Sequence, residues 1–164
     1  MSQRLETLAP SDSGASDFKE CLKHLRDGHH DEALADIGRA LRTAPDSAVY
    51  LSYAGLLAAV AEQRFRDGEQ LCLEALKLQH KHPQLYLNLA QVDQRAGRVE
   101  EAVEVLEKGF ASTGRDPKIR CALNALSKRM RRKPVLPFFD RNSPMNRVLG
   151  KWRHRLLGPL RATS

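Results

Sequence analysis

Apolar residues recur along this chain at the spacing of helix faces, with polar residues between them. From residue 99 to 110 they fall at i, i+1, i+4 and i+8, at Ala102, Val103, Leu106 and Phe110. From residue 117 to 133 they fall at i, i+3, i+4 and i+7, at Ile119, Ala122, Leu123 and Leu126. After residue 143 a third set forms one face, at Met145, Val148, Leu149, Trp152 and Leu156. These periods predict amphipathic helices, each with one buried side.

In addition to this helical pattern, small residues recur with a longer period, near 34 residues. Three slots recur, and they are occupied by Ala33, Gly68 and Ala102, by Ala40, Ala75 and Gly109, and by Cys21, Gly55 and Ala90. A fixed period of this length, with small residues where helices must approach closely, is typical of a helix-turn-helix solenoid. We expect three helix pairs, over residues 14–47, 48–82 and 83–116.

Turn residues separate the helices of these repeats and locate one irregularity. Gly28 and Gly97 stand between the two helices of the first and third repeats, and Pro83 opens the third. The second repeat has one residue more than its neighbours, and Gln63 takes the place of the turn glycine. We therefore expect a local distortion within residues 56–63.

The repeats resemble the tetratricopeptide repeat family. The third repeat carries the family's motif almost in full, at Tyr86, Leu89, Ala90, Gly97, Ala102, Leu106 and Gly109. The second carries Leu51, Ala54, Gly55, Cys72 and Ala75, and the first carries Cys21, Gly28, Ala33, Ile37, Ala40 and Pro45. The first departs from the motif at Asp17 and Glu20, as terminal repeats with one face in water often do.

An all-α domain organisation follows from the repeats and the flanking segments. Residues 1–14 are expected to form a flexible leader, and residues 15–133 an array of three repeats with a capping helix over 117–133. Residues 134–164 are expected to form a Pro/Phe linker followed by a basic amphipathic helix. Ser143 and Pro144 are suitable for the start of that helix, and Gly158 and Pro159 for its end.

Charge separates the chain into two parts. Residues 1–116 hold 14 Lys and Arg against 19 Asp and Glu, whereas residues 117–164 hold 13 against 1. The cations that we single out in the basic tail, together with one tryptophan, are Lys128, Arg129, Arg131, Arg132, Lys133, Arg147, Lys151, Trp152, Arg153 and Arg155. Three interpretations stay open: the tail packs on the repeats of its own chain, lies on an anionic membrane surface, or binds nucleic acid or an acidic protein.

The resemblance implies a partner-binding groove lined by the first helix of each repeat. The inward positions are Phe18, Lys19, Leu22 and Leu25 in the first repeat, Val49, Ser52, Tyr53 and Leu56 in the second, and Gln84, Leu87, Asn88, Gln91 and Arg95 in the third. Such a surface favours an amphipathic helix or an extended peptide as ligand.

One familiar ligand of the family is excluded at this groove. Some members hold the free carboxylate of a chaperone tail with paired Lys, Asn and Arg side chains. The matching positions in this chain are Phe18, Leu22, Tyr53, Gln84 and Asn88, of which only Asn88 has a suitable side chain. We therefore do not expect a carboxylate clamp.

Catalytic and metal-binding patterns are lacking. Phosphate loops, HExxH, GxSxG and paired Cys/His spacings do not occur. We interpret His29 and His30 as solvated turn residues, and the acidic run that includes Glu100 and Glu101 as a solvated helix face.

The remaining sequence features indicate compartment and class. The chain has an odd number of cysteines, at the distant positions Cys21, Cys72 and Cys121. This spacing does not suggest a disulfide framework and suits a reducing compartment. No signal-peptide core or membrane-spanning run is evident. We expect a cytoplasmic, non-enzymatic adaptor without cofactor or metal, with attachment to a membrane surface as an alternative location. The sequence does not indicate the partner's identity or the oligomeric state.

Overall fold

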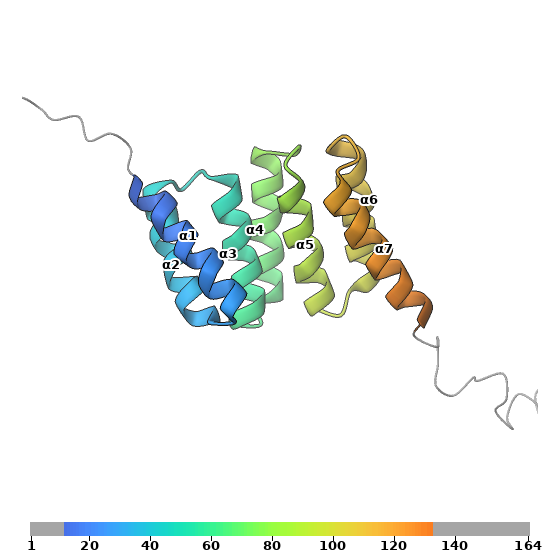
Figure 1. Cartoon of the computed structure of the whole chain (residues 1–164), viewed down its shortest axis with the longest axis horizontal. Coiled ribbons are helices and arrows are strands. Elements are labelled where there is room, and N and C mark those ends of the chain that lie inside the picture. The colour runs from blue at the N-terminus through green and yellow to red at the C-terminus, as the bar shows by residue number, and fades with distance from the viewer. Residues whose placement is uncertain (1–11, 133–164) are drawn as a thin grey trace, which may run out of the picture. The chain divides into compact units, whose positions relative to one another are not determined.

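The computed structural model describes residues 12–132 of the chain, and these residues form seven helices. The helices are α1 (Asp12–Asp27), α2 (His30–Thr43), α3 (Ala48–Ala61), α4 (Phe65–Leu78), α5 (Pro83–Arg95), α6 (Val99–Ser112) and α7 (Pro117–Arg132). The chain divides into two compact units after Leu126, and the first unit contains α1 to α6 and the larger part of α7. These helices follow one another in chain order as antiparallel hairpins (Figure 1). The expectation of an all-α array of helix pairs is confirmed, and α1 begins at Asp12, inside the segment expected to be a leader.

The helix starts follow from local chemistry. The Oγ atom of Ser47 accepts a hydrogen bond from the backbone N–H of Tyr50 before α3. Asp116 Oδ1 accepts bonds from the N–H groups of Lys118 and Ile119 before α7. Proline takes the first helical position of α5 and of α7, where its missing N–H costs nothing.

The helix ends show where the second repeat departs from its neighbours. The N–H groups of His29 and Arg98 bond to carbonyls five residues earlier, at His24 and Asp93, as a helix-ending left-handed turn requires. In the second repeat, Arg64 N–H instead bonds to Ala58 O, six residues earlier. Gln63 has a φ of 55°, so it adopts the left-handed conformation that Gly28 and Gly97 adopt elsewhere. The extra residue therefore lies between Ala58 and Arg64, as expected from the sequence.

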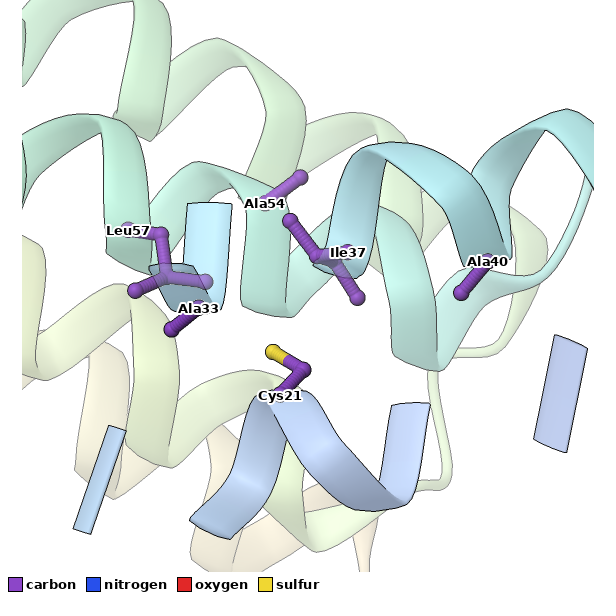
Figure 2. Packing of buried hydrophobic residues seen from close by; sticks show 6 residues of the cluster. All are labelled: Cys21, Ala33, Ile37, Ala40, Ala54 and Leu57. Carbon is purple, nitrogen blue, oxygen red and sulfur yellow. The ribbon is translucent and has the colours of Figure 1, made fainter. Parts of the chain in front are cut away.

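The repeating small residues form the contacts between helices. Cys21, Ala33, Ala40, Cys72, Ala75, Ala90 and Ala102 are all at most 1% exposed. In the first repeat, Cys21 points from α1 toward Ala33, Ile37 and Leu57 (Figure 2). Between α3 and α4, a Cβ atom added to Gly55 would lie 2.5 Å from the carbonyl oxygen of Gly68, so these two backbones touch. Small side chains thus set the helix spacing in this unit.

The odd-numbered helices form one layer of the unit. Phe18 of α1 stacks near Tyr50 and Tyr53 of α3, with ring centroids 4.8 and 5.2 Å apart. Asn88 of α5 bonds to Ser52 of α3, and Ile119 of α7 shares a core cluster with residues of α5 and α6. Each even-numbered helix packs against the odd-numbered helices before and after it.

Candidate functional site

One side of α1, α3 and α5 faces away from the even-numbered helices. On α1, Asp17 and His24 bond to Arg39 and Asp36 of α2, so the residues half a turn away lie on the free side. On α3, Gly55 faces α4, and on α5, Tyr86 faces Gly109 of α6. The free side, which we call the groove face, consists of Lys19, Leu22 and Arg26 of α1, Val49, Tyr53 and Val60 of α3, and Gln84, Gln91 and Arg95 of α5.

Aromatic residues between α1 and α3 support the centre of the groove face. Phe18 and Tyr53 are both half-buried, and the Tyr53 ring meets Phe18 edge to face. Burial raises the pKa of the Tyr53 hydroxyl, with the Cys21 thiol as a smaller cause. The phenol is therefore neutral at physiological pH, and tyrosine combines an apolar ring with a hydrogen-bonding hydroxyl, a combination favoured in binding surfaces.

Three residues expected in the groove are buried instead. Ser52 and Asn88 are fully inaccessible and Leu56 is 3% exposed. Asn88 Nδ2 donates to Ser52 Oγ at 3.0 Å, and Gln84 Nε2 donates to Asn88 Oδ1 at 2.8 Å. Leu56 packs in a cluster that includes Val92 of α5. Because α3 and α5 pack closely, the facing flanks of both helices are sealed, and the prediction that these three residues line the groove is wrong.

The other expected groove residues are at least partly exposed. Lys19, Gln91 and Arg95 are exposed, while Phe18, Leu22, Leu25, Val49, Tyr53, Gln84 and Leu87 are half-buried. Leu25 and Leu87 also pack against core clusters. Groove binding by these residues stays a prediction.

Sequence reasoning missed two members of the groove face and a second apolar surface. Arg26 is exposed and Val60 half-buried; they occupy matching places near the ends of α1 and α3. On α4, Leu73 and Leu78 are 44% and 55% exposed. A pocket of about 400 Å³ lies there, lined by Gln70, Leu73, Glu74, Leu76 and Lys77. The signal for Leu73 was its repeat slot, where the neighbouring repeats have Gly38 and Glu107.

Charged groups elsewhere in the unit serve to tie helices together. Arg39 bridges Asp17 and buried Asp36, and Arg98 bridges Glu69 and buried Asp93. Burial raises the pKa of Asp93, although its hydrogen bonds from Arg98 act in the opposite direction. The glutamates at 100, 101, 104 and 107 are exposed along α6, as a solvated face should be.

The histidines at the turns do not form a metal-binding geometry with other side chains of the described residues. His29 is exposed as expected, but His30 is the first residue of α2 and is half-buried, so the interpretation of His30 as a solvated turn residue is wrong. His82 Nδ1 accepts a hydrogen bond from the N–H of Gln84 at the start of α5. Within residues 12–132, the His, Cys, Asp and Glu side chains do not gather in threes as a metal ion would require.

The basic tail is described only in its first part. Lys128 and Arg129 are exposed on α7, and Arg131 and Arg132 lie in the last turn of that helix. The other expected tail residues, Lys133, Arg147, Lys151, Trp152, Arg153 and Arg155, lie outside the described residues, as do the linker and the final helix. In the described part of the chain, every helix is too short or too polar to cross a membrane.

Known proteins share this architecture. Residues 59–126 match the family model for the tetratricopeptide repeat. The Sgt2 tetratricopeptide repeat domain from Aspergillus fumigatus superposes with a TM-score of 0.63 at 17% identity, covering 86% of this chain and 97% of that one.

Two further similar structures are complexes with a chaperone or a chaperone peptide. The second such domain of human RPAP3, in complex with the HSP70 peptide SGPTIEEVD, gives a TM-score of 0.57 at 13% identity and covers 73% of this chain and 98% of its own. The TPR2B domain of yeast Sti1, in a complex with Hsp70, gives a TM-score of 0.59 at 14% sequence identity and covers 73% of this chain and 99% of its own. At these identities the likeness shows the fold alone, and no curated protein matches the chain in sequence. Residues 59–126 thus match the tetratricopeptide repeat sequence pattern, and the described helices have the fold of solved tetratricopeptide repeat domains.

Proposed function

We propose that this chain is a non-enzymatic adaptor whose groove face binds a peptide or helix of a partner protein. The observation that carries the proposal is the row of half-buried apolar side chains at Leu22, Val49, Tyr53 and Val60, which runs along two adjacent helices. A helix with one apolar side packs on such a row in the manner of helix-in-groove recognition. The domains of RPAP3 and Sti1, which share the fold, are themselves found with chaperone peptides or complexes.

The mode of binding that we propose differs from a clamp on a terminal carboxylate. Of the five matching positions, Phe18, Leu22 and Tyr53 have apolar or aromatic side chains and Gln84 has an amide. Asn88, the one suitable residue, is buried and uses both ends of its amide within the fold. The ligand is therefore expected to bind through apolar side chains rather than through its terminal carboxylate.

Selection of helix-forming peptides against the full chain tests this proposal. Peptides from a random library are selected, and their affinities are measured by fluorescence anisotropy against Leu22→Gln, Tyr53→Ala and Val60→Gln variants. We expect losses of tenfold or more for Tyr53→Ala, since tyrosines near the centre of an interface dominate binding. Circular dichroism and urea unfolding confirm that each variant is folded; Leu22→Gln should perturb the core least, because Tyr53 and Val60 pack against core clusters.

The matched control is the exposed apolar pair on α4, changed to Leu73→Ser and Leu78→Ser. These residues are as apolar as the groove residues but lie on an even-numbered helix. Affinity should be unchanged in this control. If the α4 variants abolish binding and the groove variants do not, the partner binds the other face and the proposal is wrong.

A second candidate function concerns the basic tail, for which the charge count of residues 117–164 is the motivating observation. We propose that it binds an anionic surface, either a membrane or nucleic acid. The test is sedimentation with phosphatidylserine vesicles and with duplex DNA, using the full chain and a variant with Arg147, Lys151, Arg153 and Arg155 changed to Gln. Each cation contributes roughly 1 kcal/mol near an anionic membrane. If neither surface sediments the unaltered chain, this candidate fails.

A further inference from the structure

Charge is distributed unevenly over the groove face. Its nine residues include the three exposed cations Lys19, Arg26 and Arg95, and none of the nine is an acid. Helix α3 has no charged residue at all from Ala48 to Ala61. Three acids of α1 and α5 are engaged elsewhere: Asp17 bonds to Arg39, Glu20 to Lys23, and Asp93 to Arg98. Asp27, the last residue of α1, is exposed and lies about a quarter turn away from the groove face on the helix. The groove face is thus apolar and cationic.

The two arginines lie at the same end of the groove face. The hairpins are antiparallel, so α1, α3 and α5 run parallel to one another. Arg26 is in the last turn of α1, Val60 in the last turn of α3, and Arg95 is the last residue of α5. Two guanidinium groups therefore flank the apolar row at its Val60 end, whereas Val49 and Gln84 at the opposite end are uncharged.

These two guanidinium groups form no ion pair within the described residues. Within residues 12–132, Arg39, Arg64 and Arg98 each contact two carboxylates, while Arg26 and Arg95 have no acid within 4.0 Å. Guanidinium groups bind carboxylates in two-point geometry when a partner supplies them. They are available for a ligand beside an apolar surface.

Resting on the proposed function, we infer that the groove face binds an acidic amphipathic segment within a partner protein. Its apolar side chains contact Leu22 and Tyr53, and its carboxylates lie at the end marked by Arg26 and Arg95. A free C-terminus is not needed, because carboxylate side chains satisfy the arginines. The chain's own tail has the wrong charge for this site, since residues 134–164 hold six Lys and Arg against one Asp.

Three synthetic peptides of 18 residues test the inference. All have Leu at i, i+3, i+4 and i+7 along one face and capped ends, and their polar positions near one end are Glu, Gln or Lys. In fluorescence anisotropy with the full chain at 50 mM NaCl, we expect the Glu peptide to bind at least tenfold tighter than the Gln peptide, and the Lys peptide to bind most weakly. At 300 mM NaCl the differences should shrink, because salt screens exposed charges. Equal affinities of the Glu and Gln peptides would overturn the inference.

Matched arginine variants test whether the preference for the Glu peptide depends on the two arginines of the groove face. Arg26→Gln with Arg95→Gln should bring the Glu peptide to the affinity of the Gln peptide. Arg42→Gln with Arg66→Gln, exposed cations on α2 and α4, should leave it unchanged. Equal losses in both pairs would overturn the inference, because they would indicate a long-range charge effect. Urea unfolding separates a stabilising role of Arg26 and Arg95 at their helix ends from a role in binding.

Two further arms distinguish this inference from the proposed function. A Glu peptide with a free C-terminal carboxylate should bind no more than twofold tighter than its amidated form, and a strong dependence on the free carboxylate overturns the inference. If peptides bind through Tyr53 regardless of their charge, the proposed function stands and the acidic preference fails. If no selected or synthetic peptide depends on Tyr53, the proposed function itself fails.

Discussion

At the scale of single residues, absent side chains are as important as large ones. A Cβ atom added to Gly109 would lie 2.6 Å from Cγ and 2.8 Å from Cβ of Tyr86, whose ring is held by a hydrogen bond from its hydroxyl to the carbonyl of His80. The ring cannot move away without breaking that bond. The distance between α5 and α6 therefore depends on one glycine.

Substitution of two glycines tests this dependence. Gly109→Ala should lower the free energy of unfolding by about 1–3 kcal/mol, the usual cost of overpacking a core. Gly38, in the middle of α2, has open space around the position of a Cβ atom, so Gly38→Ala should raise stability by about 0.5–1 kcal/mol through helix propensity. Urea unfolding measures both changes, and a tolerated Gly109→Ala would show that α5 and α6 separate easily.

The three cysteines should differ in reactivity. Burial raises the pKa of the Cys21 thiol to about 11, with nearby Asp36 as a smaller cause, and that of the Cys72 thiol to about 12. Cys121 is exposed. Because the thiolate is the reactive form, iodoacetamide at pH 7.5 should modify Cys121 alone in the native chain, as checked by peptide mass spectrometry. In 8 M urea all three should react; rapid modification of two thiols without urea would contradict the buried positions.

The sequence could not reveal which groove positions are sealed. Ser52 and Asn88 have side chains of the kind expected in a wet groove, and the repeat places them on the inner helices. They are buried because α3 and α5 pack closely where the two helices face each other. The hydrogen bond between the two side chains replaces the bonds to water that burial removes. A periodic pattern gives the direction of a side chain but not the distance to the next helix.

At the scale of elements, the helix ends carry most of the irregular structure. The wider turn after α3 accommodates one extra residue and places Gln63 in a left-handed conformation that costs an L-residue roughly 1–2 kcal/mol. The sequence predicted this turn because glycine is missing at one of three equivalent positions. The extra residue in the second repeat was the other informative signal.

Gln63→Gly should therefore stabilise the protein. Relief of the left-handed strain exceeds the added entropy of the unfolded chain, for a net gain of about 0.5–1 kcal/mol. The reverse change at the equivalent turn, Gly97→Ala, should cost about 1 kcal/mol, since Gly97 has a φ of 81°. Thermal and urea unfolding provide the measurement, and a loss of stability in Gln63→Gly would show that the glutamine side chain contributes contacts to this turn.

The ends of α4, α5 and α6 are joined through the bonds of Arg98 to Glu69 and Asp93. Because burial raises the pKa of Asp93 in the folded state above its unfolded value near 4, the folded chain binds more protons between the two values. The contribution of Asp93 to stability is therefore greatest below pH 4 and falls as the pH rises through the folded pKa.

A pH series with Asp93→Asn tests the sign of this effect. The wild-type free energy of unfolding minus that of the variant should decrease between pH 4 and pH 7. Urea unfolding at each pH gives both values, and Asp46→Asn, at an exposed position between α2 and α3, is the matched control. A difference that increases with pH would mean that the pair with Arg98 outweighs the cost of burial.

At the scale of the whole molecule, the period and the seven helices of residues 12–132 were accessible from the sequence, whereas the start of α1 at Asp12 was not. The starts of α3, α5 and α7 fall at the residues that the repeats indicated, because a solenoid repeats its local solutions. The groove's charge was not accessible, since it depends on which cations lie away from acids in space. Arg26 and Arg98 are both arginines near helix ends, and only the structure separates the unpaired one from the bridging one.

A repeat array should also unfold in parts, because each helix pair contacts only its neighbours. Leu85 is fully buried where α5 meets α3 and α4, in a cluster with Ala48 and Ala75. Leu85→Ala should cost about 2–5 kcal/mol by opening a cavity at this junction. Since no residue of α1 or α2 belongs to that cluster, hydrogen exchange should accelerate in α5 and α6 more than in α1 and α2. Ile37→Ala, in the core of the first pair, should produce the opposite order.

Equal acceleration of hydrogen exchange in all six helices in both variants would show that the repeats unfold as one cooperative unit. Coupling through the α3–α5 contact would then be strong enough to override the modular packing of the repeats.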